Sequence, residues 1–339
     1  MLTQVSVAQG IDKLAVKLEE LRAWMGTDLA EVEERLAALL SERSPAHKSA
    51  RHLVSRGGKR LRPLCVALAA RVGSEFTAEA RELAVAVELV HSATLLHDDV
   101  IDLGERRRGA ATARCIYGNA ASIYAGDLLL VDALRRIQAT GIPGLLEKSL
   151  DTLGEMLEAE ALQLANRGNV RGSVADYFRV IEGKTASLFR WALFAGGRAG
   201  DAPMELCTAL ERYGGQLGLA FQLIDDVLDL AGDPTTVGKS LFTDLREGKM
   251  TYPLLVAIER DGSLGSQIEA ACAAQASELD EGLEKHLRSV LWGAGVVQDC
   301  LALAQKYADD AVLALSVLPE SRSRTALEDV AVTLVHRER

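Results

Sequence analysis

Two aspartate clusters carry the clearest chemistry in this sequence. Each has two adjacent aspartates and a third four positions after the first, namely Asp98, Asp99 and Asp102 in LLHDDVID and Asp225, Asp226 and Asp229 in FQLIDDVLD. Residues four apart share a helix face, so the outer two carboxylates can chelate one ion, while the middle one can reach a second ion or its waters. Carboxylate oxygens without neighbouring cysteines favour Mg²⁺ over Zn²⁺, and Mg²⁺ commonly binds substrate phosphates. We therefore expect a phosphorylated substrate.

Both clusters are embedded in apolar sequence. A solvated helix face is the alternative interpretation of either cluster alone, but carboxylates in apolar surroundings are costly unless cations pair with them. The apolar neighbours are Leu95, Leu96, Val100 and Ile101 in the first case, and Phe221, Leu223, Ile224, Val227 and Leu228 in the second. The sequence therefore predicts two core-facing helices that form opposite walls of one metal-diphosphate site.

Basic residues recur near the predicted turns, where they could reach phosphate oxygens. They are Lys59, Arg60 and Arg62, then Arg106, Arg107 and Arg108, then Lys184 beside Thr185, and finally Lys239 and Lys249. Arginine binds phosphate bidentately and lysine acts as a mobile point charge. Each motif alone is weak, because GGKR is typical of a solvated turn and GKT lacks the upstream glycine of a nucleotide-binding loop. Their coincidence with the aspartates strengthens the prediction of a diphosphate site.

The elements that would position these residues are helices. Hydrophobic residues make up 48% of the 339 residues but aromatic ones only 4%, and the seven prolines fall between or at the starts of periodic stretches. Periodicity predicts a hairpin over 11–42 and helices over 77–103, 119–140, 144–166, 173–198 and 203–230, with a long loop from 231 to 253. No strand alternation is found. We expect one all-α domain over 1–339, with N-terminal helices (1–45), a motif-bearing core (46–255) and C-terminal helices (256–339).

Composition excludes several other classes. The net charge of −10 argues against a nucleic-acid partner, because no broad positive field is available. The five cysteines are widely spaced, which indicates neither a disulfide framework nor a zinc site and fits a reducing cytoplasm. No targeting segment and no uncharged stretch long enough to span a bilayer is found, so we expect a soluble, cytoplasmic protein.

Taken together, these motifs resemble the trans-prenyl diphosphate synthases of the polyprenyl synthetase family. GGKRLRP, LLHDDVID followed by RRG, GKT, FQLIDDVLD and GK…DLREGK occur in the order and spacing of that family, between residues 47 and 255. The resemblance implies a single-domain helical bundle of the isoprenoid synthase type with a central cavity. It also implies head-to-tail condensation of isopentenyl diphosphate with an allylic diphosphate, such as geranyl, farnesyl or geranylgeranyl diphosphate, with three Mg²⁺ ions.

The same resemblance implies roles for individual residues. Asp98, Asp102 and Asp225 would be the most direct metal ligands, with Asp99 and Asp229 also near the ions, and Asp226 would join them and Lys184 in catalysis. The isopentenyl diphosphate site would comprise Lys59, Arg62, His91 and Arg108. The allylic diphosphate site would comprise Arg107, Lys184, Thr185, Gln222, Lys239 and Lys249.

One position departs from the family pattern. Phe242 stands where the family usually has glycine, two residues before Asp244. Because glycine permits unusual backbone angles, the loop that carries Lys239 is expected to be shaped differently.

The helix before Asp98 offers a ruler for product length. Ala93 and Thr94 lie one turn from Asp98 and Val90 another turn away, and by family analogy a bulky aromatic at 93 or 94 would stop the chain near C15. None is present, which predicts an all-trans product of C20 or longer. A neighbouring helix could instead set the limit, through Ile123, Leu128, Met156 or Leu157.

Three alternative functions are weighed against this prediction. A short-chain C15 or C20 synthase shares every motif. A class I terpene cyclase needs no isopentenyl site and usually has an Asn/Ser/Glu motif in place of the second cluster, whereas Lys59, Arg62 and Arg108 are present here. A noncatalytic subunit of a heteromeric synthase typically loses aspartates that this chain keeps. The family resemblance also implies a homodimer and transient membrane-surface contact for product release.

Overall fold

The computed structural model describes residues 20–38 except 22, and residues 43–107, 109–231, 241–274 and 279–335. The predicted all-α fold is confirmed. The N-terminal half contains α2 (Gly26–Ala38), α3 (Pro45–Val54), α4 (Leu61–Gly73), α5 (Ala78–Ile101), α6 (Ala113–Tyr117), α7 (Asn119–Ala139) and α8 (Leu145–Ala165).

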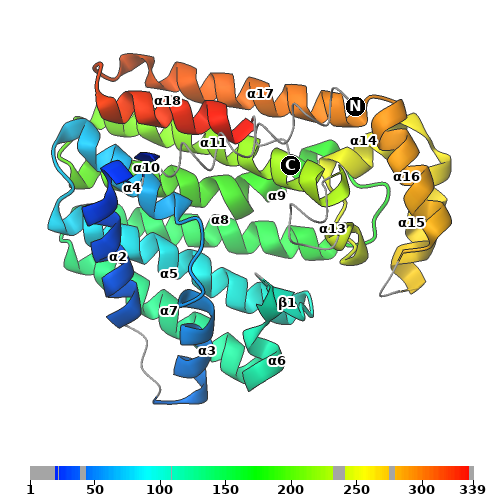
Figure 1. The fold of residues 1–339 in the computed structure, drawn as a ribbon, viewed down its shortest axis with the longest axis horizontal. Helices are drawn as coiled ribbons and strands as arrows, with labels where there is room; N and C mark the ends of the chain where they lie inside the picture. The colour runs from blue at the N-terminus through cyan, green and yellow to red at the C-terminus, as the bar shows by residue number, and fades with distance from the viewer. Residues whose placement is uncertain are drawn as a thin grey trace.

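The second half of the chain continues with helices of similar length. It contains α9 (Val174–Ile181), η1 (Glu182–Ala186), α10 (Ser187–Ala199), α11 (Met204–Ala231), α13 (Thr243–Arg246), α14 (Tyr252–Arg260), α15 (Ser263–Ala274), α16 (Glu281–Gly293), α17 (Val296–Ala314), η2 (Leu315–Val317) and α18 (Arg322–Val335). Figure 1 shows α5, α7, α8 and α11 running along the bundle, with α17 and α18 on one side and α14 to α16 gathered at one end.

Two buried clusters of apolar residues hold the helices together. The larger includes the apolar faces of α4, α5, α10 and α11, where small residues allow close packing; Cys65 to Ala70 on α4 are completely buried. The smaller lies at the end of the bundle around α14 to α17 and includes Val227 and Phe242. Burial of apolar surface is the main driving force here, so both aspartate helices are anchored in dense cores.

The helix predicted over 173–198 is divided by a π-helical turn. This turn, η1, has wider i to i+5 bonding and carries Lys184 and Thr185. Glycine allows neighbouring helices to approach it closely: a Cβ on Gly218 of α11 would lie 2.5 Å from the Cα of Ala186, and one on Gly183 would lie 2.7 Å from the Cβ of Ala159 on α8. Side chains from α8, η1 and α11 can therefore converge.

Two local predictions require correction. The basic turn after α5 forms a short antiparallel hairpin, β1 (Arg106–Arg107) and β2 (Ala110–Ala111), although the sequence shows no strand alternation. Two-residue strands are too short to produce such a pattern. The segment expected to be a loop up to 253 contains α13 and the first residues of α14. Neither element is long enough to show helical periodicity beforehand.

No single helix in the described ranges has the length and hydropathy to cross a bilayer; only α16 and the α17–η2 segment taken together, with a 56° bend between them, pass by length and composition.

Candidate active site

The first aspartate cluster ends α5. Asp98 and Asp99 lie in its last turn, and Asp102 is its C-cap, with its N–H donating to the Asp98 carbonyl at 2.8 Å. Asp99 is buried and accepts a bond from Arg107 Nε at 2.8 Å. Burial raises the pKa of Asp99, and the Arg107 guanidinium opposes that rise. The hairpin β1–β2 therefore places Arg107 against the middle aspartate.

Asp102 is engaged by two cations from distant parts of the chain. Lys249 Nζ donates to its Oδ2 at 2.8 Å, and Arg167, just after α8, pairs with its Oδ1. Burial works against ionisation of Asp102, but Lys249 and Arg167 outweigh it, so the pKa of Asp102 is lowered. For Lys249 itself, burial favours the neutral form, yet Asp244, Glu247 and Asp102 together raise its pKa. Both partners are therefore held in their charged forms.

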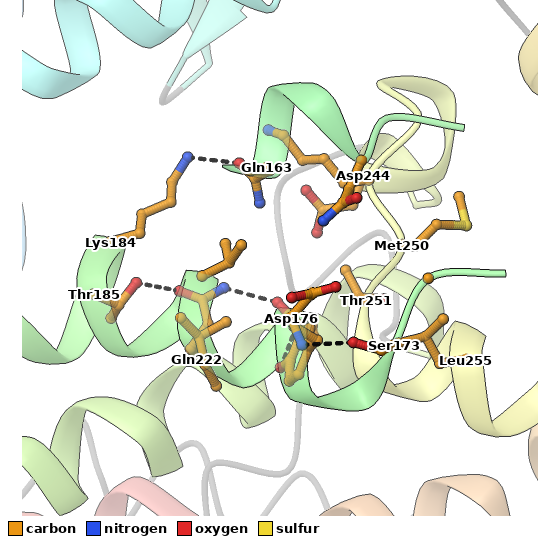
Figure 2. A pocket seen from close by; sticks show the side chains of 17 residues that line it. Gln163, Ser173, Asp176, Lys184, Thr185, Gln222, Asp244, Met250, Thr251 and Leu255 are labelled. Carbon is orange, nitrogen blue, oxygen red and sulfur yellow. Dashed lines mark hydrogen bonds between the residues drawn. The ribbon is translucent and has the colours of Figure 1, made fainter. Parts of the chain in front are cut away.

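Lys184 connects the first cluster to α8. From η1 its ammonium lies 3.8 Å from Asp98 Oδ2, 2.6 Å from Glu160 Oε1 and 3.0 Å from Gln163 Oε1. Figure 2 shows Lys184 reaching across to Gln163 at the rim of a pocket. Burial and the nearby Asp98 raise the pKa of Glu160, while Lys184 counteracts them. Lys184 is thus a cation shared by three oxygen-bearing side chains.

The second cluster lies near the end of α11 and is held by neutral donors. Asp226 is buried; it accepts from the Tyr177 hydroxyl and from Gln222 Nε2, each at 2.7 Å. Thr185 Oγ1 donates to Gln222 Oε1 at 2.7 Å, which extends the chain of bonds to η1 (Figure 2). Burial, with a contribution from Asp244, raises the pKa of Asp226 well above its usual range.

Asp229 organises the segment after α11. Its carboxylate accepts the backbone N–H groups of Thr243 and Asp244 at 3.1 Å, and its carbonyl accepts the Phe242 N–H at 2.8 Å. Phe242 has φ of 59° and ψ of 27°, the left-handed conformation that glycine adopts most easily. Its ring is buried and lies under the Arg288 guanidinium, 5.2 Å from ring centroid to Cζ. The backbone geometry expected of glycine is therefore adopted by phenylalanine.

Several of these groups line one pocket. It has a volume of about 710 Å³ including its open mouth, and α8, α9, η1, α11 and the segment 244–255 line it. Lys184, Thr185, Gln222, Asp226 and Lys249 are among its lining residues. The two lysines reach from this pocket to the carboxylates of the first cluster. The first cluster is therefore linked to the pocket through Lys184 and Lys249, whereas Asp226 of the second cluster lines it directly.

The basic loop before α4 has mixed environments. Lys59 is exposed. Arg62 stacks over the Phe189 ring, 4.5 Å from Cζ to ring centroid, and its buried Nε has no hydrogen-bond partner among the described residues. His91 is half-buried on α5. Two predicted site residues, Arg108 and Lys239, lie outside the described residues.

The predicted chain-length residues lie on α5 before the first cluster. Val90 and Ala93 are buried, and Thr94 is half-buried with its hydroxyl donating to the His91 carbonyl at 2.8 Å. Of the four residues considered on neighbouring helices, Ile123, Leu128 and Leu157 are exposed and only Met156 is buried. Met156 therefore remains as the interior candidate on α8.

The oxygen-rich donor set suits Mg²⁺, which prefers hard ligands. Across the described residues, no three Asp, Glu, His or Cys side chains lie close enough together to hold one ion. Lys184, Lys249 and Arg167 instead approach Asp98 and Asp102. The site is thus rich in carboxylates, of which Asp98 and Asp102 are engaged by cations.

Sequence reasoning missed several residues of this site. Arg167, Glu160, Gln163 and Tyr177 lack a recognisable motif. The only signal for Glu160 and Gln163 is their position on a predicted helix, because their roles depend on how α8 packs against η1. Asp244 could have been found, since it lies in the DLREGK segment.

Comparisons with known proteins agree with this geometry. A family model described as polyprenyl synthetase matches residues 44–290. Octaprenyl diphosphate synthase of Escherichia coli is 37% identical over 96% of this chain and 100% of its own length. Heptaprenyl diphosphate synthase component 2 of Geobacillus stearothermophilus is 34% identical over 95% of this chain and 100% of its own.

A solved structure is equally similar. The polyprenyl synthase of Caulobacter crescentus CB15, complexed with calcium and isoprenyl diphosphate, superposes with a TM-score of 0.89 at 37% identity, covering 95% of this chain and 98% of that one. The helical fold of the isoprenoid synthases is therefore confirmed. The chain belongs to the polyprenyl synthetase family and is a prenyltransferase.

Proposed function

We propose that the enzyme condenses isopentenyl diphosphate head to tail with an allylic diphosphate, using Mg²⁺, to give an all-trans polyprenyl diphosphate of C20 or longer. The observation that carries the proposal is a pocket lined by Asp226 of the second cluster and by two lysines that pair with the first cluster. Lys184 and Lys249 line this pocket and reach Asp98 and Asp102, while Asp226 lines it from α11. Acidic and basic groups in one cavity suit a metal-bound diphosphate.

Asp98, Asp102 and Asp225 are assigned as the direct metal ligands, for three ions in total. Asp99 and Asp229 are assigned a place beside the ions; their carboxylates hold Arg107 and the amides of residues 243–244. Bound Mg²⁺ would stabilise the negative charge that grows on the departing diphosphate. Calcium accompanies isoprenyl diphosphate in the Caulobacter crescentus relative, which supports a divalent-ion site.

The cations of the pocket bind the allylic diphosphate in this proposal. Lys184 and Lys249 transfer from their carboxylates to phosphate oxygens, and Arg107 and Lys239 add positive charge. Thr185 and Gln222 are linked by a 2.7 Å hydrogen bond and present oxygen dipoles to the developing allylic cation. Electrostatic stabilisation of both charges then accounts for catalysis without a protein nucleophile.

Isopentenyl diphosphate is assigned to the basic loop and α5. Lys59, Arg62 and Arg108 bind its diphosphate together with His91. The Arg62 guanidinium stacks on the Phe189 ring. This contact fixes the plane of the guanidinium and so the directions of its N–H groups. Attack of the isopentenyl double bond on the allylic cation forms the new carbon–carbon bond, and a proton leaves to the released diphosphate.

The product length follows from the side chains before Asp98. Val90, Ala93 and Thr94 offer no aromatic plug on that part of α5. Relatives named octaprenyl and heptaprenyl diphosphate synthase support a medium- to long-chain product.

Incubation of the purified chain with radiolabelled isopentenyl diphosphate, farnesyl diphosphate and Mg²⁺ tests the proposal. Thin-layer chromatography of the dephosphorylated products resolves their lengths. We expect labelled alcohols of C20 or longer. Because one condensation with farnesyl diphosphate already gives C20, a parallel incubation uses geranyl diphosphate, and labelled products that stop at C15 there would favour a short-chain synthase. Cyclic hydrocarbons would favour a terpene cyclase, and no condensation with either primer would favour a noncatalytic subunit.

We also propose that the active form is a homodimer assembled through α7 and α8. Exposed apolar residues line these helices: Ile123, Tyr124, Leu128, Val131, Leu150, Leu157 and Leu164. Leu150, Leu157 and Leu164 are seven apart and so lie on one face of α8. Large exposed apolar patches commonly mark interfaces.

Light scattering on the purified chain tests this assembly. A dimer that dissociates on Leu157→Glu supports it. A monomer that condenses substrates only with a second protein would support a heteromeric enzyme, of which the Geobacillus relative's name, component 2, is suggestive.

A further inference from the structure

Arg60 forms a buried ion-pair junction that the proposed chemistry does not use. Its guanidinium is bidentate to Glu33 of α2, with Nε–Oε1 at 2.6 Å and Nη2–Oε2 at 3.1 Å, and its Nη1 lies 2.5 Å from Glu88 Oε1 of α5. Nη2 also donates to the Val54 carbonyl of α3 at 3.1 Å. One side chain therefore ties the basic loop to three helices.

The two carboxylates of this junction differ in exposure. The Glu88 side chain is 4% exposed, whereas that of Glu33 is 49% exposed. Removal of one partner from a buried ion pair leaves an uncompensated charge, whereas water replaces an exposed partner at little cost. Glu88 is therefore the partner whose loss most disturbs Arg60.

The backbone of Arg60 requires such support. Arg60 precedes the first residue of α4 with φ of 48° and ψ of 35°, a left-handed conformation that is unfavourable for a residue with a Cβ. Its side chain makes no local capping bond, so the ion pairs to other helices are what hold it. The angles at Arg60 set the direction in which the chain leaves Lys59 and enters Arg62.

Glu88 also acts on Arg62 and lies beside His91. Burial lowers the pKa of the Arg62 guanidinium, and the Glu88 charge counteracts this. Glu88 and His91 are three apart on α5 and so share a face. The buried carboxylate thus lies among the groups assigned to isopentenyl diphosphate.

We propose that Glu88 is a positioning residue for isopentenyl diphosphate binding, acting through Arg60 to fix the loop so that Lys59 and Arg62 converge on the diphosphate. This inference rests on the proposed function only for the identity of the ligand. Glu88 does not contact substrate, and it stays paired with Arg60 throughout the reaction.

Glu88→Gln tests the proposal, with Glu33→Gln as the matched control on the same guanidinium. Calorimetric titration of each full-length protein with isopentenyl diphosphate measures binding without requiring turnover. We expect Glu88→Gln to weaken binding at least 10-fold, with the KM for farnesyl diphosphate within twofold of the wild-type value. Glu33→Gln should remain within twofold for both ligands. Arg60→Lys should resemble Glu88→Gln, because lysine cannot bond to both carboxylates in this geometry.

Several outcomes would overturn the inference. They are wild-type affinity in Glu88→Gln, equal losses for both substrates, or no isopentenyl diphosphate binding by the wild-type chain. If Glu88→Gln does not fold, Glu88→Asp and Arg60→Lys provide the same comparison of ligands. A wild-type chain that binds isopentenyl diphosphate but forms no product would refute the proposed condensation while leaving the role of Glu88 to the binding data.

Discussion

At the end of α5, Asp99 and Asp102 are held by cations, whereas Asp226 on α11 is held by neutral donors. Asp99 and Asp102 pair with Arg107 and with Lys249 and Arg167. Asp226, in contrast, accepts from Tyr177 and Gln222. Asp102 and Asp226 are therefore in different electrostatic settings: the pKa of Asp102 falls, whereas the pKa values of the two buried middle aspartates, Asp99 and Asp226, rise.

This difference suggests a division of labour within the site. In the proposed function, the first cluster exchanges its lysines for metal ions when the diphosphate arrives, so its cations become available at that moment. The second cluster keeps a fixed hydrogen-bonded frame that joins η1, α9 and α11. One wall is then exchangeable and the other is rigid.

Loss of an aspartate from the first cluster, whose carboxylates pair with cations, should have the largest effect on activity and stability. Asp102→Asn removes a proposed metal ligand and the carboxylate that pairs with Arg167 and Lys249. We expect kcat to fall about 10³-fold, in line with loss of one preorganised charge, and the free energy of unfolding to fall by about 3 kcal/mol. Steady-state assays and urea denaturation measure the two effects. The half-exposed Asp132, paired with Arg136 at 2.9 Å, is the control, and an equal loss in Asp132→Asn would refute the assignment.

Loss of a neutral hydrogen-bond donor to Asp226 should have a smaller effect on activity and stability. Tyr177→Phe removes the 2.7 Å bond to Asp226, and we expect about 1–2 kcal/mol less stability and roughly a 10-fold lower kcat, since one supporting bond of the frame is lost. Tyr213→Phe is the matched control, because the buried Tyr213 hydroxyl donates to the Leu327 carbonyl, also at 2.7 Å. If both variants lose the same activity, the frame has no special role.

Replacement of Phe242 tests whether the backbone after α11 is strained. Both Phe242→Ala and Phe242→Gly lose the buried ring, but only glycine relieves the left-handed backbone at φ of 59°. We expect the glycine variant to be more stable than the alanine variant by about 1 kcal/mol. Thermal unfolding of the two proteins gives the comparison, and an alanine variant that is the more stable would show that the conformation is not strained.

The pH dependence of stability should have opposite signs for Asp102 and Asp226 and is the smallest effect. The pKa of Asp226 is raised from 3.8, so its contribution to stability decreases as pH rises above about 3.8; that of Asp102 is lowered from 3.8, so its contribution is present above 3.8 and is lost at lower pH. Metal-free urea denaturation between pH 3 and 8 tests this. Asp226→Asn should gain stability relative to wild type as pH rises, and the deficit of Asp102→Asn should shrink below pH 3.8. If the unfolding free energies of both variants ran parallel to that of the wild type across this pH range, the opposite signs would be contradicted.

The sequence predicted the long elements and the charged residues well, because both leave local signals. The helices that carry Asp98 and Asp225 are long and periodic, and the motifs around them are specific. The π-turn at Lys184 was not predictable, since helical periodicity continues through it and its close packing against α8 and α11 depends on the tertiary structure.

The partners of the aspartates were equally hidden from sequence. Arg167 is 65 positions from Asp102 and Tyr177 is 49 positions from Asp226, so only tertiary packing pairs them. At Phe242, in contrast, the sequence revealed the unusual residue but not its backbone conformation. Its departure from glycine was visible in the sequence, but the backbone angles were kept, because burial of the ring and the Arg288 contact favour them.

A crystal structure with Mg²⁺ and a non-ionisable thio analogue of an allylic diphosphate tests the central claim most directly. The account predicts that Asp98 and Asp102 from α5 and Asp225 from α11 bind ions on the same diphosphate, with Lys184 and Lys249 moved from carboxylate to phosphate oxygens. A diphosphate bound to one cluster alone, with Lys249 still on Asp102, would contradict it.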